Sequence, residues 1–90
     1  MPEETIDLDL DGKVVAVPRE LVSLLAAGAA ARAGVSARHR DLSLLLGRAL
    51  ESGMASLDQD HVRALCAVIE EHRDGRFDAA AAELLREAAA

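Results

Sequence analysis

Three aspartates near the N-terminus are the first residues whose types and spacing suggest chemistry, in the stretch Asp7-Leu8-Asp9-Leu10-Asp11-Gly12. The spacing D-x-D-x-D-G opens a twelve-residue calcium loop, in which carboxylate and carbonyl oxygens surround the ion. Such a loop needs a bidentate carboxylate at its twelfth position, which here is occupied by Pro18. The nearest acid, Glu20, comes two residues too late. We therefore expect no calcium site at this stretch.

The same residues predict a β-hairpin over residues 5–17 that turns at Asp11-Gly12. Both central residues of a type I′ turn need positive φ, which Asp-Gly accommodates. A turn at this point gathers the apolar side chains on one face of the hairpin and places Asp7 and Asp9 on the other. The predicted pairs are Leu10 with Lys13, Asp9 with Val14, Leu8 with Val15, Asp7 with Ala16, and Ile6 with Val17.

One cysteine and three histidines are the remaining candidates for nucleophilic or metal chemistry. Cys66 lies five positions after His61 on an expected helix, so about 140° around the axis separates their side chains. His72 lies on the same side as His61, but about 16 Å further along the axis. These spacings form neither a nucleophile–base pair nor a chelate, and Cys66 is expected to be a small core residue. The sequence therefore predicts a protein that is not an enzyme and has no metal or cofactor.

Length and composition restrict the class of protein further. Ninety residues suit a single domain, and a hydrophobic content of 51% argues against disorder along the whole chain. The only aromatic residue is Phe77, so the chain has no set of rings for stacking on nucleic-acid bases. The single cysteine, the acidic start and the lack of an apolar run of about 20 residues favour a cytoplasmic protein without a membrane span.

Helical periodicity and capping residues organise the chain after the hairpin. Pro18 suits the first turn of a helix, and Ser36 and Gly53 bound a second one. Ser56-Leu57-Asp58-Gln59 has the spacing of a capping box, and Asp78 is a suitable cap for a last helix. The expected helices cover residues 18–33, 36–52, 57–73 and 78–89. The predicted fold class is therefore mainly α: one domain, 1–90, with an N-terminal β-hairpin followed by a small bundle of three or four helices.

A positive patch interrupts a chain whose net charge is −6, and it consists of Arg32, Arg38, His39 and Arg40. Just before it, the stretch Ala30-Ala31-Arg32-Ala33-Gly34-Val35-Ser36 resembles the helix–turn–helix of bacterial repressors of the Lac type. The resemblance implies that the helix after this turn enters the major groove of DNA, with Arg38, His39 and Arg40 near base edges. The alternative interpretation of the stretch is helix capping alone. A degenerate helix–turn–helix around residues 30–50 would make the protein a small DNA-binding regulator.

A second resemblance lies near the C-terminus. The stretch Gly75-Arg76-Phe77-Asp78-Ala79-Ala80-Ala81-Ala82-Glu83-Leu84 is similar to the second helix of a tetratricopeptide repeat. Such repeats have about 34 residues each and need at least three copies to share a core, whereas this chain has one half-repeat. The alternative is an Asp78-capped helix in which Phe77 packs against Ala81 or Ala82.

Small residues along the first expected helix suggest a surface for close contact. Ala26, Ala30 and Ala33 recur at i, i+4 and i+7, so that another helix of this chain or of a partner can approach closely. A two-stranded hairpin also has two open edges that a second copy can pair. We therefore expect a non-catalytic protein-interaction or regulatory module that forms a homodimer through the hairpin edge and this helix. Asp7 and Asp9 are expected to contribute to binding of another protein.

Overall fold

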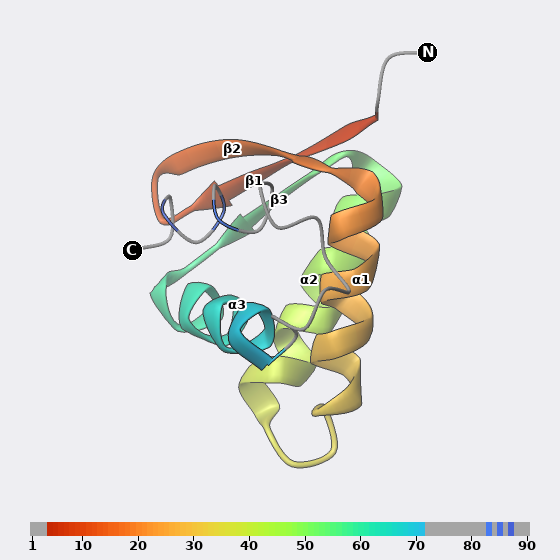
Figure 1. Ribbon diagram of the computed structural model, residues 1–90, viewed down its shortest axis with the longest axis vertical. Coiled ribbons are helices and arrows are strands. Elements are labelled where there is room, and N and C mark those ends of the chain that lie inside the picture. The colour runs from red at the N-terminus through yellow and green to blue at the C-terminus, as the bar shows by residue number, and fades with distance from the viewer. Residues whose placement is uncertain (1–3, 72–82, 84, 86, 88–90) are drawn as a thin grey trace.

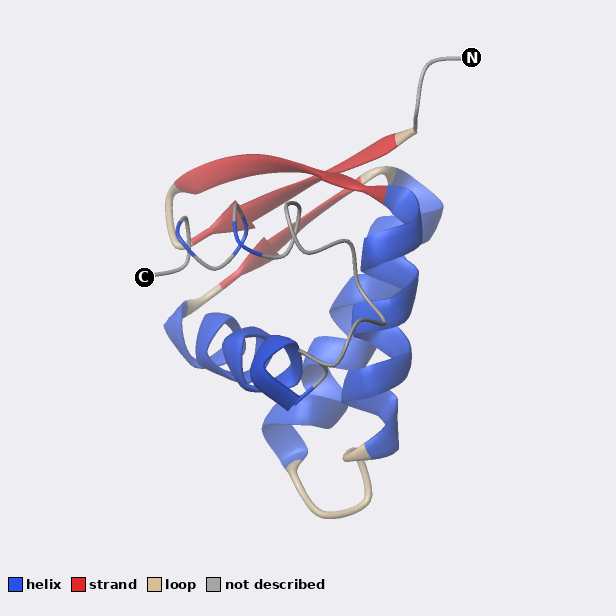
Figure 2. Cartoon of the chain, viewed as in Figure 1, coloured by secondary structure: helices blue, strands red, loops and turns tan. Residues whose placement is uncertain are grey.

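The computed structural model of the protein describes residues 4–71, 83, 85 and 87. In chain order the elements are β1 (Thr5–Leu10), β2 (Lys13–Pro18), α1 (Arg19–Ala31), α2 (Ala37–Ser52), β3 (Met54–Leu57) and α3 (Gln59–Glu71). The strands form one sheet, and the three helices lie on the same side of it (Figures 1 and 2). The result is a two-layer arrangement in which the helices cover one face of the sheet.

The predicted fold class, a hairpin followed by a helical bundle, is wrong because the hairpin belongs to a three-stranded sheet with the order β2-β1-β3. β3 runs parallel to β1 on the side away from β2. At one end of this pair, the amide of Asp7 donates a hydrogen bond to the carbonyl oxygen of Gly53 at 3.0 Å. At the other end, the amide of Asp11 donates to the carbonyl oxygen of Leu57, also at 3.0 Å. β1 is therefore the central strand, and the helices pack on a sheet.

The register of the hairpin is confirmed for every predicted pair. Asp11 and Gly12 form the turn with φ values of 53° and 101°, the positive values that a two-residue turn of this type needs. The Oδ1 atom of Asp9 accepts a hydrogen bond from the amide of Gly12 at 2.8 Å. The turn residues and one carboxylate thus fix the pairing of β1 with β2.

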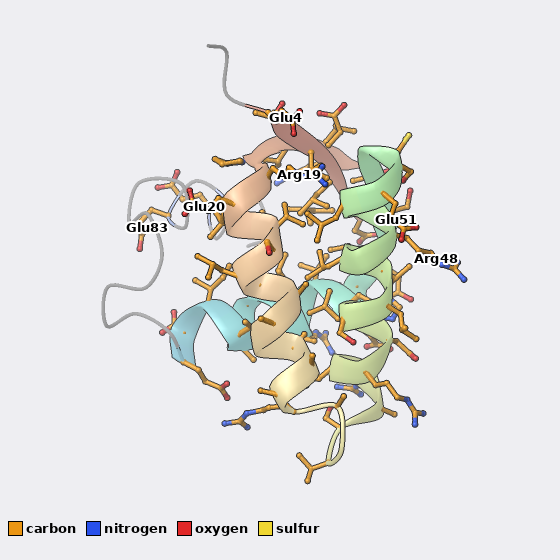
Figure 3. All side chains as sticks on the ribbon, turned by 90° about the vertical axis from the view of Figure 1, so that its right-hand side faces the viewer. Glu4, Arg19, Glu20, Arg48, Glu51 and Glu83 are labelled. Carbon is orange, nitrogen blue, oxygen red and sulfur yellow. The ribbon has the colours of Figure 1, made fainter. Side chains whose placement is uncertain are left out.

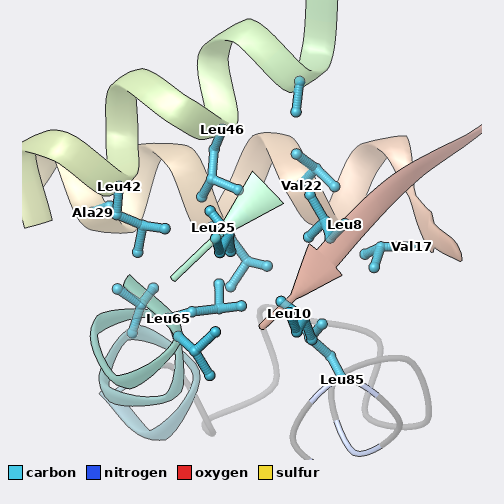
Figure 4. Close-up of a cluster of buried hydrophobic side chains, with 14 of the residues drawn as sticks. Leu8, Leu10, Val17, Val22, Leu25, Ala29, Leu42, Leu46, Leu65 and Leu85 are labelled. Atoms are coloured by element: carbon cyan, nitrogen blue, oxygen red, sulfur yellow. The ribbon is translucent and has the colours of Figure 1, made fainter. Parts of the chain in front are cut away.

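One buried cluster joins the sheet to the helices (Figure 4). Ile6, Leu8 and Leu10 of β1 point into it, alternating with the aspartates that point away. The helices add Leu21, Val22, Leu25 and Ala29 from α1, Leu42, Leu46 and Ala49 from α2, and Val62, Ala64, Leu65, Val68 and Ile69 from α3. This cluster holds the sheet face that is opposite the aspartates against all three helices.

The C-terminal part of the chain contributes to the same cluster. Leu85 is fully buried in it and points toward Leu10 in Figure 4. Of the helix predicted over 78–89, the structure describes only three residues. The predicted contact of Phe77, and most of the stretch that is similar to a tetratricopeptide helix, lie outside the described residues.

α3 begins later than the capping-box pattern predicted. The Oδ1 atom of Asp58 accepts a hydrogen bond from the amide of His61 at 2.9 Å, so Asp58 is the capping residue. Ser56, the expected cap, lies in β3 instead. The helix predicted over 57–73 accordingly starts at Gln59, because the residues before it extend the sheet.

Gly47, inside α2, and Gly53, at the C-terminal end of α2, provide a matched test of the backbone conformation that ends this helix. Gly53 ends the helix with φ of 88°, whereas Gly47 lies in its interior, and a Cβ added at either position meets no heavy atom within 4 Å. We expect Gly53→Ala to lower the free energy of unfolding by about 1 kcal/mol, because a left-handed backbone disfavours a Cβ. Gly47→Ala is expected to raise it by about 0.5–1 kcal/mol. Urea denaturation measures both changes, and a change of the same sign in the two variants would contradict the prediction.

Candidate interaction surface

β2 is an edge strand, since among the described residues it pairs with β1 alone. Along an antiparallel pair, backbone amide and carbonyl groups point alternately toward and away from the neighbouring strand. The two-residue turn makes Leu10–Lys13 a hydrogen-bonded pair, so the backbone groups of Val14 and Ala16 point away from β1. Asp7, the partner of Ala16, agrees with this alternation, because its amide points away from β2 and donates to the carbonyl oxygen of Gly53, directly before β3. The outer edge of β2 therefore presents the donors and acceptors of Val14 and Ala16.

The two ends of this edge limit how far another strand can extend along it. Lys13 is exposed at one end. At the other end Pro18, which has no amide hydrogen, directly precedes α1. Charged side chains and proline on an edge strand restrict pairing with other chains. The stretch open to pairing is therefore short and apolar, residues 14–17.

The sheet face that points away from the helices combines carboxylates with apolar side chains. On the central strand β1, Asp7 is exposed and Asp9 is half-buried. Val14 and Ala16 flank them on β2, and Met54 lies beside Asp7 on β3. Val14 and Met54 are large apolar residues that are 67% and 62% exposed. We call this set of five residues the outer face of the sheet.

The small residues predicted to form a contact surface on α1 do not share one environment. Ala26 is half-buried and packs against the core, Ala30 is exposed, and Ala33 lies half-buried in the turn after the helix. Their neighbour Ala29 is fully buried and lies next to Leu42 of α2 in Figure 4. Part of the small-residue pattern of α1 therefore serves close packing within the molecule.

The positive patch lies at the end of the molecule that is farthest from the sheet, where α1 turns into α2 (Figure 1). Arg38 and Arg40 are exposed, and His39 is half-buried. In the turn, Arg32 pairs with Glu71 of α3 at 2.6 Å. α1 and α2 lie side by side and run in opposite directions (Figure 3), whereas the helices of a DNA-binding helix–turn–helix cross at about 90–120°. The arrangement of α1 and α2 gives no support to groove insertion.

A shallow pocket of about 400 Å³ lies where β1 and β3 end, and its titratable groups are Asp9, Asp11, Asp58 and His61. Two of these carboxylates already hold backbone amides, at Gly12 and at His61. Asp58 Oδ1 also lies 2.8 Å from the Nδ1 atom of His61. Within the described part of the chain, no group of three or more His, Cys, Asp or Glu residues is placed to hold a metal ion.

Cys66, predicted to be a small core residue, is half-buried and packs against the core cluster without belonging to its fully buried set. His72 lies outside the described residues. Among the helices that the structure describes, none combines the length and apolar character needed to cross a membrane.

Sequence reasoning identified only part of the outer face. Alternation along the hairpin placed Asp7 and Asp9 on this face. The predicted register pairs them with Ala16 and Val14, so the sequence was sufficient to place these two residues there as well. Met54 joins this face only through β3, which no local pattern indicated.

Comparison of the chain with family models, curated protein sequences and solved structures finds no match.

Proposed function

We propose that this protein is a non-catalytic interaction module that forms a homodimer through the open edge of β2. The observation that supports the proposal is the short apolar stretch of β2 with outward-pointing amides and carbonyls, at an edge that no described residue covers. Two copies related by a two-fold axis can pair these strands antiparallel, which joins two three-stranded sheets into one. The helices of both copies then lie on the same face of the joined sheet.

One register of this pairing is favoured. Val14 of one copy lies opposite Ala16 of the second copy, and each of the two equivalent pairs exchanges two N–H···O bonds. Val15 then meets its own equivalent on the two-fold axis. A shift that brings Pro18 opposite Val14 loses a donor, because proline has no amide hydrogen. A shift in the other direction requires Gly12, which belongs to the turn, to act as a strand residue.

The proposal rests on β2 rather than on α1. Of the alanines expected to contribute, Ala26 packs against the core of the molecule and Ala33 lies beyond the helix. Stable dimers usually bury about 1,200–2,000 Å² in total, and pairing of two short strands falls at the low end. We therefore expect a weak dimer that forms only at high protein concentration.

Sedimentation velocity over about 5–500 µM tests the dimer, together with two variants of Ala16. Ala16→Pro removes an outward amide without removing a hydrogen bond between β1 and β2, so we expect a folded monomer at every concentration. Ala16→Ser keeps the amide and a similar volume, and it is expected to dimerise like the native protein. Circular dichroism tests whether both variants are folded.

A second variant keeps this test decisive if proline at position 16 prevents folding. Val14→Lys places a charge on an exposed side chain beside the proposed two-fold axis, where lysine opposes edge-to-edge pairing. We expect it to be a folded monomer. A native protein that stays monomeric at the highest concentration, or variants that dimerise as strongly as the native chain, would show the proposal to be wrong.

A further inference from the structure

The joined sheet of the proposed dimer creates a surface that neither copy has alone. In its centre the two β2 strands lie side by side, so Val14 and Ala16 of both copies form one apolar strip on the outer face. A β1 strand follows on each side and carries Asp7 and Asp9 on the same face. The apolar strip therefore lies between two parallel rows of carboxylates.

We infer that this strip is a docking groove for a cationic amphipathic helix of a partner protein, an inference that rests on the proposed dimer. Neighbouring strands are about 4.8 Å apart, so the two aspartate rows, three strand spacings from each other, are separated by about 14 Å. An α-helix with its side chains is about 10–12 Å across, which fits between the rows. Six residues of β2 extend about 20 Å, the length of about 13 helical residues.

Charge decides which helix fits this groove. Neither Asp7 nor Asp9 forms an ion pair with a described residue, and Asp9 uses one oxygen to hold the turn. A helix whose apolar stripe covers Val14 and Ala16 while lysine or arginine residues line both sides satisfies the carboxylates of both copies at once. The same carboxylates repel nucleic acid and anionic lipid surfaces. An extended peptide does not suit this site, because addition of a strand needs a sheet edge rather than a sheet face.

The test uses the full protein and a synthetic 14-residue peptide with leucines at helical spacing and lysines on both flanks. Two control peptides have either the same composition in scrambled order or glutamate in place of lysine. Fluorescence anisotropy at low salt measures affinity, and NMR amide shifts of the protein locate the site. We expect saturable binding of one peptide per dimer, with amide shifts at Asp7 and Asp9, which lie outside the proposed contact between the copies, and at least about tenfold weaker binding of either control peptide.

Paired variants separate the groove from general attraction to an acidic protein. Asp7→Asn with Asp9→Asn removes two charges from the groove and keeps the oxygen that accepts from Gly12, and we expect about five- to tenfold weaker binding. Asp41→Asn with Glu51→Gln removes two exposed charges from α2, which lies on the other side of the sheet, and is expected to change affinity by less than about twofold. Equal effects of the two double variants would overturn the inference.

The oligomeric state of the same samples separates this inference from the proposed function. A dimer that fails to bind the amphipathic peptide overturns the groove and leaves the dimer intact. A protein that stays monomeric overturns the dimer, and the groove with it. Binding of one peptide per monomer, or of the scrambled peptide as tightly as the amphipathic one, also overturns the groove.

Discussion

Leu8→Ala is expected to lower the free energy of unfolding by about 3–4 kcal/mol, a large part of the stability of a small domain. Leu8 is fully buried in the central strand, with β2 hydrogen-bonded on one side and β3 on the other. Since both neighbouring strands hold its backbone in place, the structure cannot relax far enough to fill the cavity. Urea denaturation monitored by circular dichroism measures the loss.

The matched control for this change lies one strand away on the opposite face. Val14→Ala also removes apolar atoms, but the side chain of Val14 is 67% exposed, so we expect a change below about 0.5 kcal/mol. The measurement is made well below the dissociation constant of the proposed dimer, so that only folding is observed. A loss below about 1 kcal/mol for Leu8→Ala would contradict its central position in the core.

Leu85→Ala is expected to cost about 2–4 kcal/mol, although Leu85 lies far along the chain from the sheet that it helps to bury. Its side chain is fully buried in the cluster formed by β1 and the helices. Removing it leaves a cavity beside Leu10, toward which it points in Figure 4. Glu87→Ala, at an exposed position two residues later, is the control and should change stability by less than about 0.5 kcal/mol. Equal losses in the two variants would mean that the burial of Leu85 contributes nothing to stability.

The hairpin was predictable because all of its determinants are local. Asp11-Gly12 selects the turn, the turn selects the register, and the register assigns each side chain to a face. The ends of α2 were similarly accessible, since Ser36 accepts from the amide of His39 and Gly53 adopts the left-handed conformation that ends a helix. Interactions within a few residues decide these features, so a single sequence is sufficient to find them.

β3 was missed because its pairing is not local. Met54–Leu57 has only four residues, with no β-branched side chain, and its partner β1 lies more than forty residues earlier. Ser56 and Asp58 both suit a helix start, and only pairing with β1 decides that the earlier of the two belongs to a strand. The error in fold class follows from this one segment, since β3 makes β1 the centre of a sheet.

The candidate surface was likewise predictable only where it depends on local interactions. The sequence indicated that Asp7 and Asp9 share a face, and the hairpin register was sufficient to add Val14 and Ala16. The sequence did not indicate that β3 covers the second edge of β1. Of the two edges of the predicted hairpin, only the edge of β2 is therefore left for pairing. The proposed contact is therefore narrower than the sequence alone suggested.

The central position of β1 has a consequence for protein synthesis. Of the described strands, β1 is made first, yet the strand that covers its second edge is made last, after both α1 and α2. At about 5–20 residues per second, ribosomes need a few seconds to reach Met54–Leu57. Until β3 is made, β1 lacks the strand that covers its second edge, and an uncovered strand edge is the kind of surface on which unfinished chains aggregate. In the completed sheet β3 covers this edge of β1, so the edges that remain open among the described strands are those of β2 and of the short strand β3.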